Sequence, residues 1–412
     1  MQFYIAVSLK LITILVMVVV ILKYKKYGIC HPYVIVSVSY MVLIVFGEIF
    51  YTYVKGRYYD HYAESLTYIG FISMFLGTFV AKYRVILSSL KNRGVYVFAG
   101  AKSNYCIYFV AAIGVMAFLV LVLFSGVPII SDNVNEARIR FFSGKGYLNV
   151  FFISLQIVPL AILFDVFARK MYSRIIWCHL FSVVVFFLNI ATGFRGIAIK
   201  SILLYFLTYL FISNKKLSLA KGAVVLLALL LFLSVVGAFR REGKVGIEGV
   251  AREIGITLVA RPAIFETIVK KFDVSSRFNG IGYVYDFLKF KPGEQKGKNV
   301  ELKYMFFKNY KNMPESAGIN PSIIGEAYVN FGVSGVFIIP FIVGFIVRRL
   351  YMRCYDNFTF FNVVLYVSVV LEVSLALASG LGPRLPMYSL VLFWICLISL
   401  FYSKRIVIKG DL

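Results

Sequence analysis

The most regular feature of the chain is a series of long apolar segments separated by short polar connections. Each segment has roughly 17–22 residues, the length that an α-helix needs to cross a bilayer. We expect about eleven such helices, which predicts an all-α polytopic membrane protein. The predicted spans are residues 3–22, 33–51, 65–81, 105–125, 147–167, 174–192, 197–213, 222–239, 321–347, 358–378 and 386–402.

The composition supports this fold class. Of the 412 residues, 60% are hydrophobic and only 15% are charged, and the mean hydropathy is +0.84. A soluble protein of this length would carry far more polar surface. The net charge of +25 could indicate a nucleic acid partner, but much of the excess lies in short connections. The positive-inside rule explains that placement, so we expect no nucleic acid partner.

The basic connections set the expected orientation. Six segments are rich in Lys and Arg and alternate with the others: KYKKYGICHP, KYRVILSSLKNRGVYVFAGAK, ARKMYSR, NKKLSLAKG, RRLYMRCYDN and KRIVIKGDL. The positive-inside rule places all six in the cytoplasm, so we expect the N-terminus on the outer side of the membrane and the C-terminus in the cytoplasm. The first basic cluster follows the first apolar segment, which favours a retained span over a cleavable signal peptide.

One long polar segment, residues 240–320, separates the eighth and ninth predicted spans. It lies on the outer side by the same alternation, since long loops cross membranes regardless of their charge. We therefore expect three parts: helices 1–8 in residues 1–239, an outer subdomain in residues 240–320, and helices 9–11 in residues 321–412.

Several charged residues lie inside the predicted spans, in their outer halves or at the outer edge. Charges within a bilayer are costly, and they usually face a cavity or an oppositely charged partner. Their one-sided distribution indicates a water-filled cavity that opens outward. The alternative is that these charges pair with one another and hold helices together. The clearest cases are Lys10, Glu48, Lys200, Glu326 and Glu372.

The stretch INPSIIGEAYVNFGVSGV predicts a polar helix face at the start of the ninth span. Asn320 can cap a helix that has Pro321 at its first position. Polar residues then recur every fourth position, which places them on one helix face: Ser322, Glu326, Asn330 and Ser334. This stripe is typical of the wall of a site, in which partly buried Glu326 would act as a general base. The alternative is that these side chains satisfy one another inside the bundle.

Arginines occur in several outer connections. Arg195 stands between two glycines in the GFRG turn, where a ligand could approach the backbone closely. Arginine stays charged and binds phosphate oxygens in a bidentate fork. If these side chains converge, they make a site for a lipid-linked phosphate or pyrophosphate; otherwise they contact lipid headgroups. The others are Arg138, Arg140, Arg240, Arg241, Arg252, Arg261 and Arg384.

Other kinds of chemistry have no support in the sequence. We find no metal-ligand cluster, phosphate-cradling glycine loop or nucleophile elbow, so we expect no metal ion, no cofactor and no ATP hydrolysis. None of the five cysteines lies in a predicted outer connection, so we expect no disulfide bonds.

Three motifs resemble the O-antigen polymerases, the Wzy-type oligosaccharide repeat-unit polymerases of bacterial envelopes. They are TGFRG, FRREG at the end of the eighth span, and NPSIIGEAYVNFGVSGVFIIPFIVG after the large outer loop. The resemblance implies a metal-independent membrane glycosyltransferase with a GT-C-like helical bundle and one large periplasmic loop between spans 8 and 9. Such an enzyme works in the bacterial inner membrane, where it moves a glycan from undecaprenyl pyrophosphate onto another lipid-linked repeat unit.

The resemblance also implies roles for the candidate residues. Positive charge beside the departing pyrophosphate eases its departure. Glu326 and Arg195 are then the candidate catalytic residues. The candidate ligands of the pyrophosphate or glycan are Arg138, Arg140, Arg240, Arg241, Arg261, Arg384 and Asn330. The implied partners are undecaprenyl-pyrophosphate-linked glycans and membrane lipid, with a chain-length regulator and a flippase.

Three alternatives remain open. An O-antigen ligase would use the same donor, but residues 240–320 hold no histidine, which counts against that family by resemblance. A non-enzymatic flippase or transporter of lipid-linked oligosaccharides usually shows internal repeats and helices broken at mid-membrane. A structural partner within an envelope complex has no positive sign in the sequence.

Overall fold

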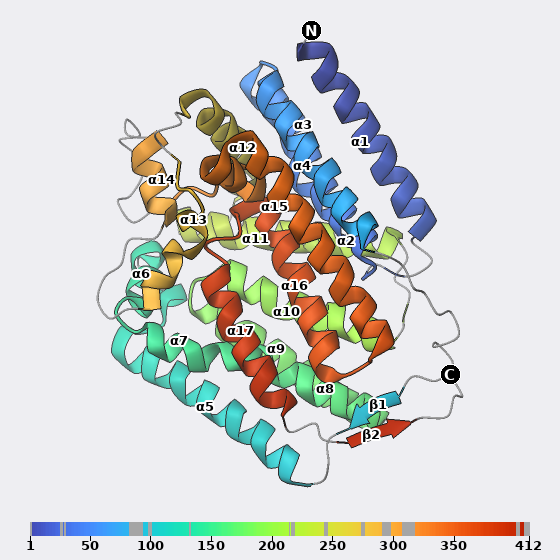
Figure 1. The fold of residues 1–412 in the computed structure, drawn as a ribbon. Coiled ribbons are helices and arrows are strands. Elements are labelled where there is room, and N and C mark those ends of the chain that lie inside the picture. Colours follow the sequence, from blue (N-terminus) through green and yellow to red (C-terminus); the bar gives the residue numbers. More distant parts are fainter. Residues whose placement is uncertain are drawn as a thin grey trace.

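A computed structural model gives the fold of the chain (Figure 1). The residues that it describes are 2–24, 28, 30–81, 94–97, 101–131, 133–213, 215, 219–242, 246–272, 277–290, 298–306, 318–400 and 404–407.

Helices make up almost all of the described structure. The α-helices are α1 (Gln2–Tyr24), α2 (Pro32–Tyr40), α3 (Phe46–Lys55), α4 (His61–Val80), α5 (Ala101–Ser125), α6 (Val134–Phe142), α7 (Gly146–Phe152), α8 (Val158–Ala168), α9 (Ile175–Ala191), α10 (Arg195–Ser213), α11 (Leu219–Glu242), α12 (Ile247–Lys271), α13 (Ile281–Val284), α14 (Lys298–Phe306), α15 (Ser322–Asp356), α16 (Phe360–Ser379) and α17 (Leu385–Ser399). Shorter helical turns are η2 (Met41–Val45), η4 (Pro128–Ile130), η5 (Ile153–Gln156), η6 (Tyr172–Arg174) and η8 (Tyr285–Phe290).

The chain is a polytopic membrane protein. Within the described residues, nine helical segments are long and apolar enough to cross a bilayer. Two of them combine consecutive short helices: α2, η2 and α3 form one segment, and α7, η5 and α8 form another. The remaining two predicted spans are also helical, as α11 and α17, but α17 has only 15 residues. The total of eleven spans therefore stays a prediction.

The helices pack side by side, and the two ends of the bundle differ (Figure 1). The end that carries α6, α12, α13 and α14 is called the α12 end below. At the opposite end, β1 (Gly94–Val97) pairs antiparallel with β2 (Lys404–Val407), which the sequence did not predict. This pairing places two basic segments on one side of the bundle, as the predicted alternation requires.

Helices α4 and α15 pack closely over a long contact, and small residues make this approach possible. A Cβ atom on Gly77 would lie 2.0 Å from the carbonyl oxygen of Phe341, and one on Gly344 would lie 2.0 Å from that of Met74. Small residues let backbones approach in membrane proteins, where helix association depends on packing rather than on expelling water. The hydroxyl of Ser73 also donates to the carbonyl oxygen of Phe337.

The segment expected to form an outer subdomain packs directly on the bundle. Helix α12 contacts α3, α11 and α15, and η8 contacts α7 and α17. Apolar residues of this segment belong to the same hydrophobic core as the spans: Val259, Phe265, Ile268, Leu302 and Phe306. Residues 247–306 therefore help to build the α12 end.

The start of α15 differs from its prediction in two ways. The helix begins at Ser322, whose hydroxyl accepts the Gly325 N–H at 3.1 Å, so Asn320 is not its capping residue. The helix is also interrupted at Gly332, where φ is +66° and ψ is −149°. The predicted four-residue stripe was wrong in its last member, because the break turns Ser334 to the surface. The other three members are buried.

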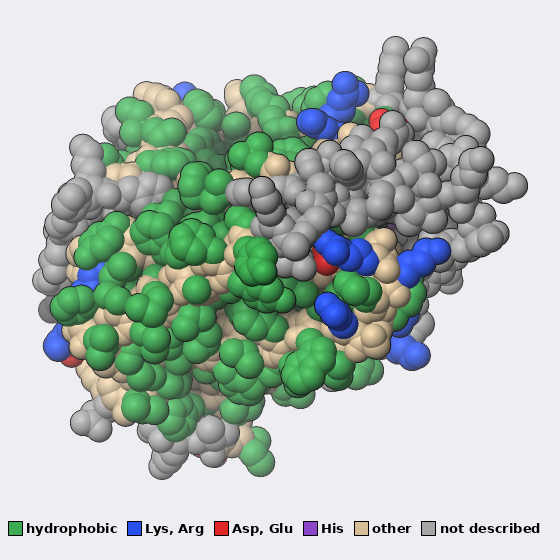
Figure 2. Space-filling model, turned by 90° about the horizontal axis from the view of Figure 1, so that it is seen from below, with side chains coloured by type: hydrophobic (Ala, Val, Ile, Leu, Met, Phe, Trp, Pro, Cys, Tyr) green, Lys and Arg blue, Asp and Glu red, His purple; other side chains and the backbone are tan. Residues whose placement is uncertain are grey.

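The outer surface suits a lipid environment. Figure 2 shows a face covered mostly by hydrophobic side chains, with most of the visible Lys and Arg on one side and a few near the other edges. Large apolar side chains are exposed along both α5 and α9, which in water would be an unusually large apolar patch. They include Tyr108, Phe109, Met116 and Leu123 on α5, and Trp177, Leu180 and Phe187 on α9.

The α4–α15 contact generates a stability prediction. Gly77→Ala should destabilise the protein by about 1–3 kcal/mol, because the new methyl group must displace the α15 backbone. The measurement is the melting temperature of the purified protein in detergent. Gly255→Ala is the control, because nothing lies within 4 Å of a Cβ atom at that helical position. Equal melting temperatures for the two variants would contradict the close approach.

Candidate functional site

The GFRG turn places Arg195 at the first position of α10. Gly193 takes a φ of +75°, a left-handed conformation that favours glycine, and so reverses the chain between α9 and α10. The Arg195 guanidinium then reaches α12, where Nη1 and Nη2 lie 3.3 and 3.4 Å from Oε2 of Glu253. Gly237 of α11 leaves room for this pair, since a Cβ atom there would lie 2.0 Å from Nη1.

Arg138 of α6 lies next to Arg195. Its guanidinium carbon is 5.4 Å from the ring centre of Phe194, a cation–π contact. Burial, together with the positive charge of Arg195, lowers the pKa of Arg138. Its Nε atom is buried and has no hydrogen-bond partner in the described structure. Two like charges are therefore held side by side with an N–H group that lacks an acceptor.

A second charged group lies where α16 ends and α17 begins. Glu372 of α16 pairs with Lys200 of α10, and its Oε2 atom also lies 3.0 Å from Nη1 of Arg384. Arg384 further donates from Nε to the hydroxyl of Ser379 at 2.5 Å. One carboxylate thus bridges a cation of α10 and a cation of the turn between α16 and α17.

Arg261 of α12 adds a third cation to this group. Burial, together with the neighbouring charge of Arg384, lowers the pKa of Arg261 to about 10. Its Nη1 atom is buried and finds no hydrogen-bond acceptor among the described residues. A buried donor without an acceptor is costly, and an anion bound between the two arginines would remove that cost.

Taken together, these side chains carry an excess of positive charge. Arg138 and Arg195 belong to one group, and Lys200, Arg261 and Arg384 belong to the other; the five cations of the two groups are called the cation cluster below. Among the described residues, the carboxylates that contact these cations or the turn before Arg384 are Glu253, Glu372 and Glu326, so five positive charges face three negative ones. Ion pairs with these carboxylates account for part of the positive charge, in agreement with the alternative that buried charges pair and hold helices together. The remaining charge at the α12 end is suited to an anion with several oxygens.

Glu326 is fully buried in the first turns of α15. Its carboxylate accepts the backbone N–H of Leu381, and that of Gly382 at 2.9 and 3.0 Å. It therefore binds the turn that connects α16 to α17. The expectation that Glu326 is the general base stays a prediction, and these contacts favour a different role that is argued below.

Asn330 is also fully buried and links α15 to the loop before α13. Its amide nitrogen donates to the carbonyl oxygen of Glu326 at 2.8 Å, and its amide oxygen accepts the Gly280 N–H at 3.1 Å. A Cβ atom on Gly282 would lie 2.8 Å from the same amide oxygen. These contacts position the loop, and a role in glycan binding stays a prediction.

The other predicted arginines are not placed in the cation cluster. Arg140 is exposed and pairs with Glu136, one turn earlier on α6. Arg252 is exposed on α12. Arg240 and Arg241 belong to the last turn of α11, but their side chains lie outside the described structure.

The sequence analysis did not identify Glu253, and for Lys10 and Glu48 it left open whether they line a cavity or pair with each other. Glu253 was not predicted, because its position shows only once residues 247–271 are known to form a helix against the bundle. The predicted intramembrane charges Lys10 and Glu48 pair with each other at 3.3 Å, and Lys10 also pairs with Glu64 at 2.9 Å. For this group the pairing alternative is confirmed.

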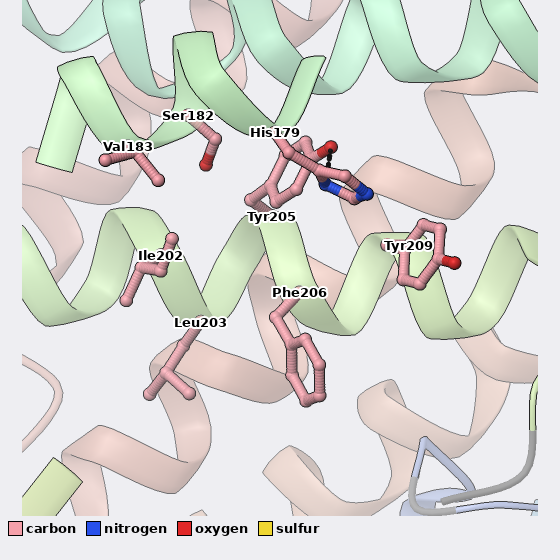
Figure 3. Close-up of a pocket in the computed structure, with 8 residues that line it drawn as sticks. All are labelled: His179, Ser182, Val183, Ile202, Leu203, Tyr205, Phe206 and Tyr209. Carbon is pink, nitrogen blue, oxygen red and sulfur yellow. Dashed lines mark hydrogen bonds between the residues drawn. The ribbon is translucent and has the colours of Figure 1, made fainter. Parts of the chain in front are cut away.

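An apolar groove lies between α9 and α10 (Figure 3). It has a volume of about 320 Å³, and none of the predicted site residues lines it. Its main polar contact joins the hydroxyl of Tyr205 to Nδ1 of His179 at 2.8 Å. The described lining residues are His179, Ser182, Val183, Ile202, Leu203, Tyr205, Phe206 and Tyr209.

The groove and the cation cluster share α10. Arg195, Ile202 and Tyr209 are seven residues apart, so they follow one face of the helix. With a rise of 1.5 Å per residue, the groove begins roughly 10 Å below Arg195 and ends roughly 21 Å below it. A charged end and an apolar end therefore follow each other along one helix.

Within the described residues, no three His, Cys, Asp or Glu side chains are grouped so that they could hold a metal ion. No protein-family model, curated protein or solved structure matches this chain.

The charged bridge at Glu372 generates a prediction. Lys200→Met should destabilise the protein by about 3 kcal/mol, because it leaves a buried carboxylate with fewer partners. The loss should be at the low end for a buried pair, since Arg384 still contacts Glu372. Thermal unfolding in detergent measures it, with the exposed Lys215→Met as the control. A melting temperature equal to that of the control would show that Lys200 is not needed to compensate Glu372.

Proposed function

We propose that this chain polymerises undecaprenyl-pyrophosphate-linked oligosaccharide repeat units of the O-antigen type. The reaction is glycosyl transfer at the periplasmic face of a bacterial inner membrane. The observation that carries the proposal is the cation cluster, to which α6, α10, α12 and the turn before α17 all contribute at one end of a membrane-spanning bundle. The sequence resemblance suggests the reaction, and the fixed positive charge of the cation cluster supports it because it suits a diphosphate.

The cation cluster fits the chemistry of this transfer. The bond between the donor sugar and the pyrophosphate oxygen breaks, and a new bond forms to a hydroxyl oxygen of the acceptor sugar. Negative charge grows on the departing pyrophosphate, and fixed positive charge stabilises it there. The hydroxyl proton passes to a base, and undecaprenyl pyrophosphate leaves. The leaving group is already activated, so the reaction needs no ATP.

The groove between α9 and α10 supports the proposal from the lipid side. If the diphosphate of the lipid binds at Arg195, the apolar tail of the lipid starts at the same face of α10 that carries Ile202 and Tyr209. The groove lining is apolar and half-buried in the membrane-spanning part of the chain. We assign this groove to the polyprenyl tail of that same lipid.

The central prediction concerns Arg195. Arg195→Ala should lower the rate of transfer by about 10²–10³-fold, because it removes positive charge from the leaving group. Cells that carry only this variant should make envelope glycans one repeat unit long. The measurement is the glycan ladder on a gel, compared with Lys215→Ala, an exposed residue on the connection after α10. A normal ladder from correctly inserted Arg195→Ala would remove Arg195 from the site.

Deletion of the gene separates the proposal from its alternatives. Loss of a polymerase leaves single repeat units attached to lipopolysaccharide. Loss of a ligase or a flippase leaves no repeat units attached. The second outcome would reject polymerisation, even if Arg195→Ala is inactive.

The assigned groove generates a second prediction. Leu203→Trp fills the groove and should raise the KM for a donor with a full-length polyprenyl tail by about tenfold, since apolar burial is lost. A donor with a tail too short to reach the groove should be unaffected. Leu180→Trp, on the exposed face of α9, is the matched control. An equal effect on long and short tails would place the tail elsewhere.

A further inference from the structure

We infer that Glu326 is a positioning residue that holds the turn of residues 380–384 and so places Arg384 where its side chain contacts Glu372. The inference rests on the proposed function only for the idea that Arg384 and Arg261 together bind the diphosphate. The interaction between Glu326 and the turn stands without it.

The first step is the placement of the Glu326 carboxylate. It is 0% exposed, and both of its oxygens accept backbone N–H groups from the turn. A general base needs an oxygen within hydrogen-bond reach of the substrate hydroxyl. A carboxylate buried in this way accepts hydrogen bonds from the backbone N–H groups of the turn. Without it, those N–H groups would lack acceptors.

The second step connects the carboxylate to Arg384 through the backbone. Glu326 binds the Leu381 N–H, and the carbonyl oxygen of Leu381 accepts the Arg384 N–H at 2.9 Å. The position of Leu381 therefore sets where the backbone of Arg384 begins α17. From there the side chain reaches Ser379 and Glu372, and its positive charge acts on Arg261 of α12.

The third step is the shape of the turn itself. Gly380 has a φ of +85°, which an L side chain rarely adopts, and a Cβ atom there would lie 2.9 Å from Oε2 of Glu326. The absence of a side chain at Gly380 thus leaves the space that the Glu326 carboxylate occupies. A change at either position should release the same turn.

The test compares variants that separate positioning from proton transfer. Glu326→Gln replaces one acceptor oxygen by a donor, whereas Gly380→Ala disturbs the turn and keeps the carboxylate. Hydrogen exchange at the Leu381 and Gly382 amides reports the turn directly and needs no substrate. We expect both variants to exchange these amides about 10- to 100-fold faster than wild type, since charge-assisted hydrogen bonds are lost.

Activity then identifies the role. With purified protein and a lipid-linked donor, both variants should raise the KM for the donor and keep the shape of the pH–rate profile. Adding Arg384→Lys to Glu326→Gln should cost little more than the larger single effect, because both changes act on one unit. If Glu326 were the base, Glu326→Gln would instead lower kcat and remove the basic-group limb of the profile.

Three results would overturn the inference. They are unchanged amide exchange in Glu326→Gln, wild-type activity of Gly380→Ala, and additive effects of the Glu326 and Arg384 changes. If Glu326→Gln does not fold, Gly380→Ala still decides, because it leaves the carboxylate in place. Faster amide exchange in variants of a chain whose wild type transfers no glycan would instead reject the proposed function and leave the role in the turn intact.

Discussion

The structure depends on the cost of placing charge in apolar surroundings. Three buried carboxylates at the α12 end are compensated, Glu253 by Arg195, Glu372 by two cations and Glu326 by backbone N–H groups. Charges in such surroundings are tolerated only when they are paired or hydrogen-bonded. These contacts join helices that are distant in the sequence, so the same interactions that make the charges tolerable also assemble the end of the bundle.

The compensation is incomplete, and that imbalance is what makes the α12 end a candidate site. Arg138 and Arg261 each lie beside another arginine, and each keeps a buried N–H group without an acceptor in the described structure. An anion is the partner that such an arrangement lacks. Since α10 carries both part of this charge and one wall of an apolar groove, the structure suits a ligand with an anionic head and an apolar tail.

Much of the fold could be predicted from the sequence, because the length and apolar character of a span are local properties. All eleven predicted spans are helical, although only nine meet the criteria for crossing a bilayer in the described residues. The charged residues worth attention were also visible, because charge within a span is rare. The strands were missed, since the paired residues of β1 and β2 are more than 300 positions apart, as in Gly94 and Val407.

The sequence by itself determined that this is a membrane-spanning helical chain, where its spans lie, and that charge gathers near one end of them. Only the tertiary structure decided which charges meet. Arg195 and Glu253 are 58 positions apart, and Glu326 and Gly382 are 56 apart. Helical periodicity orders side chains within a few turns, whereas such contacts follow from how helices cross. The break at Gly332 likewise has distant surroundings, because a Cβ atom there would lie 2.9 Å from the guanidinium of Arg277.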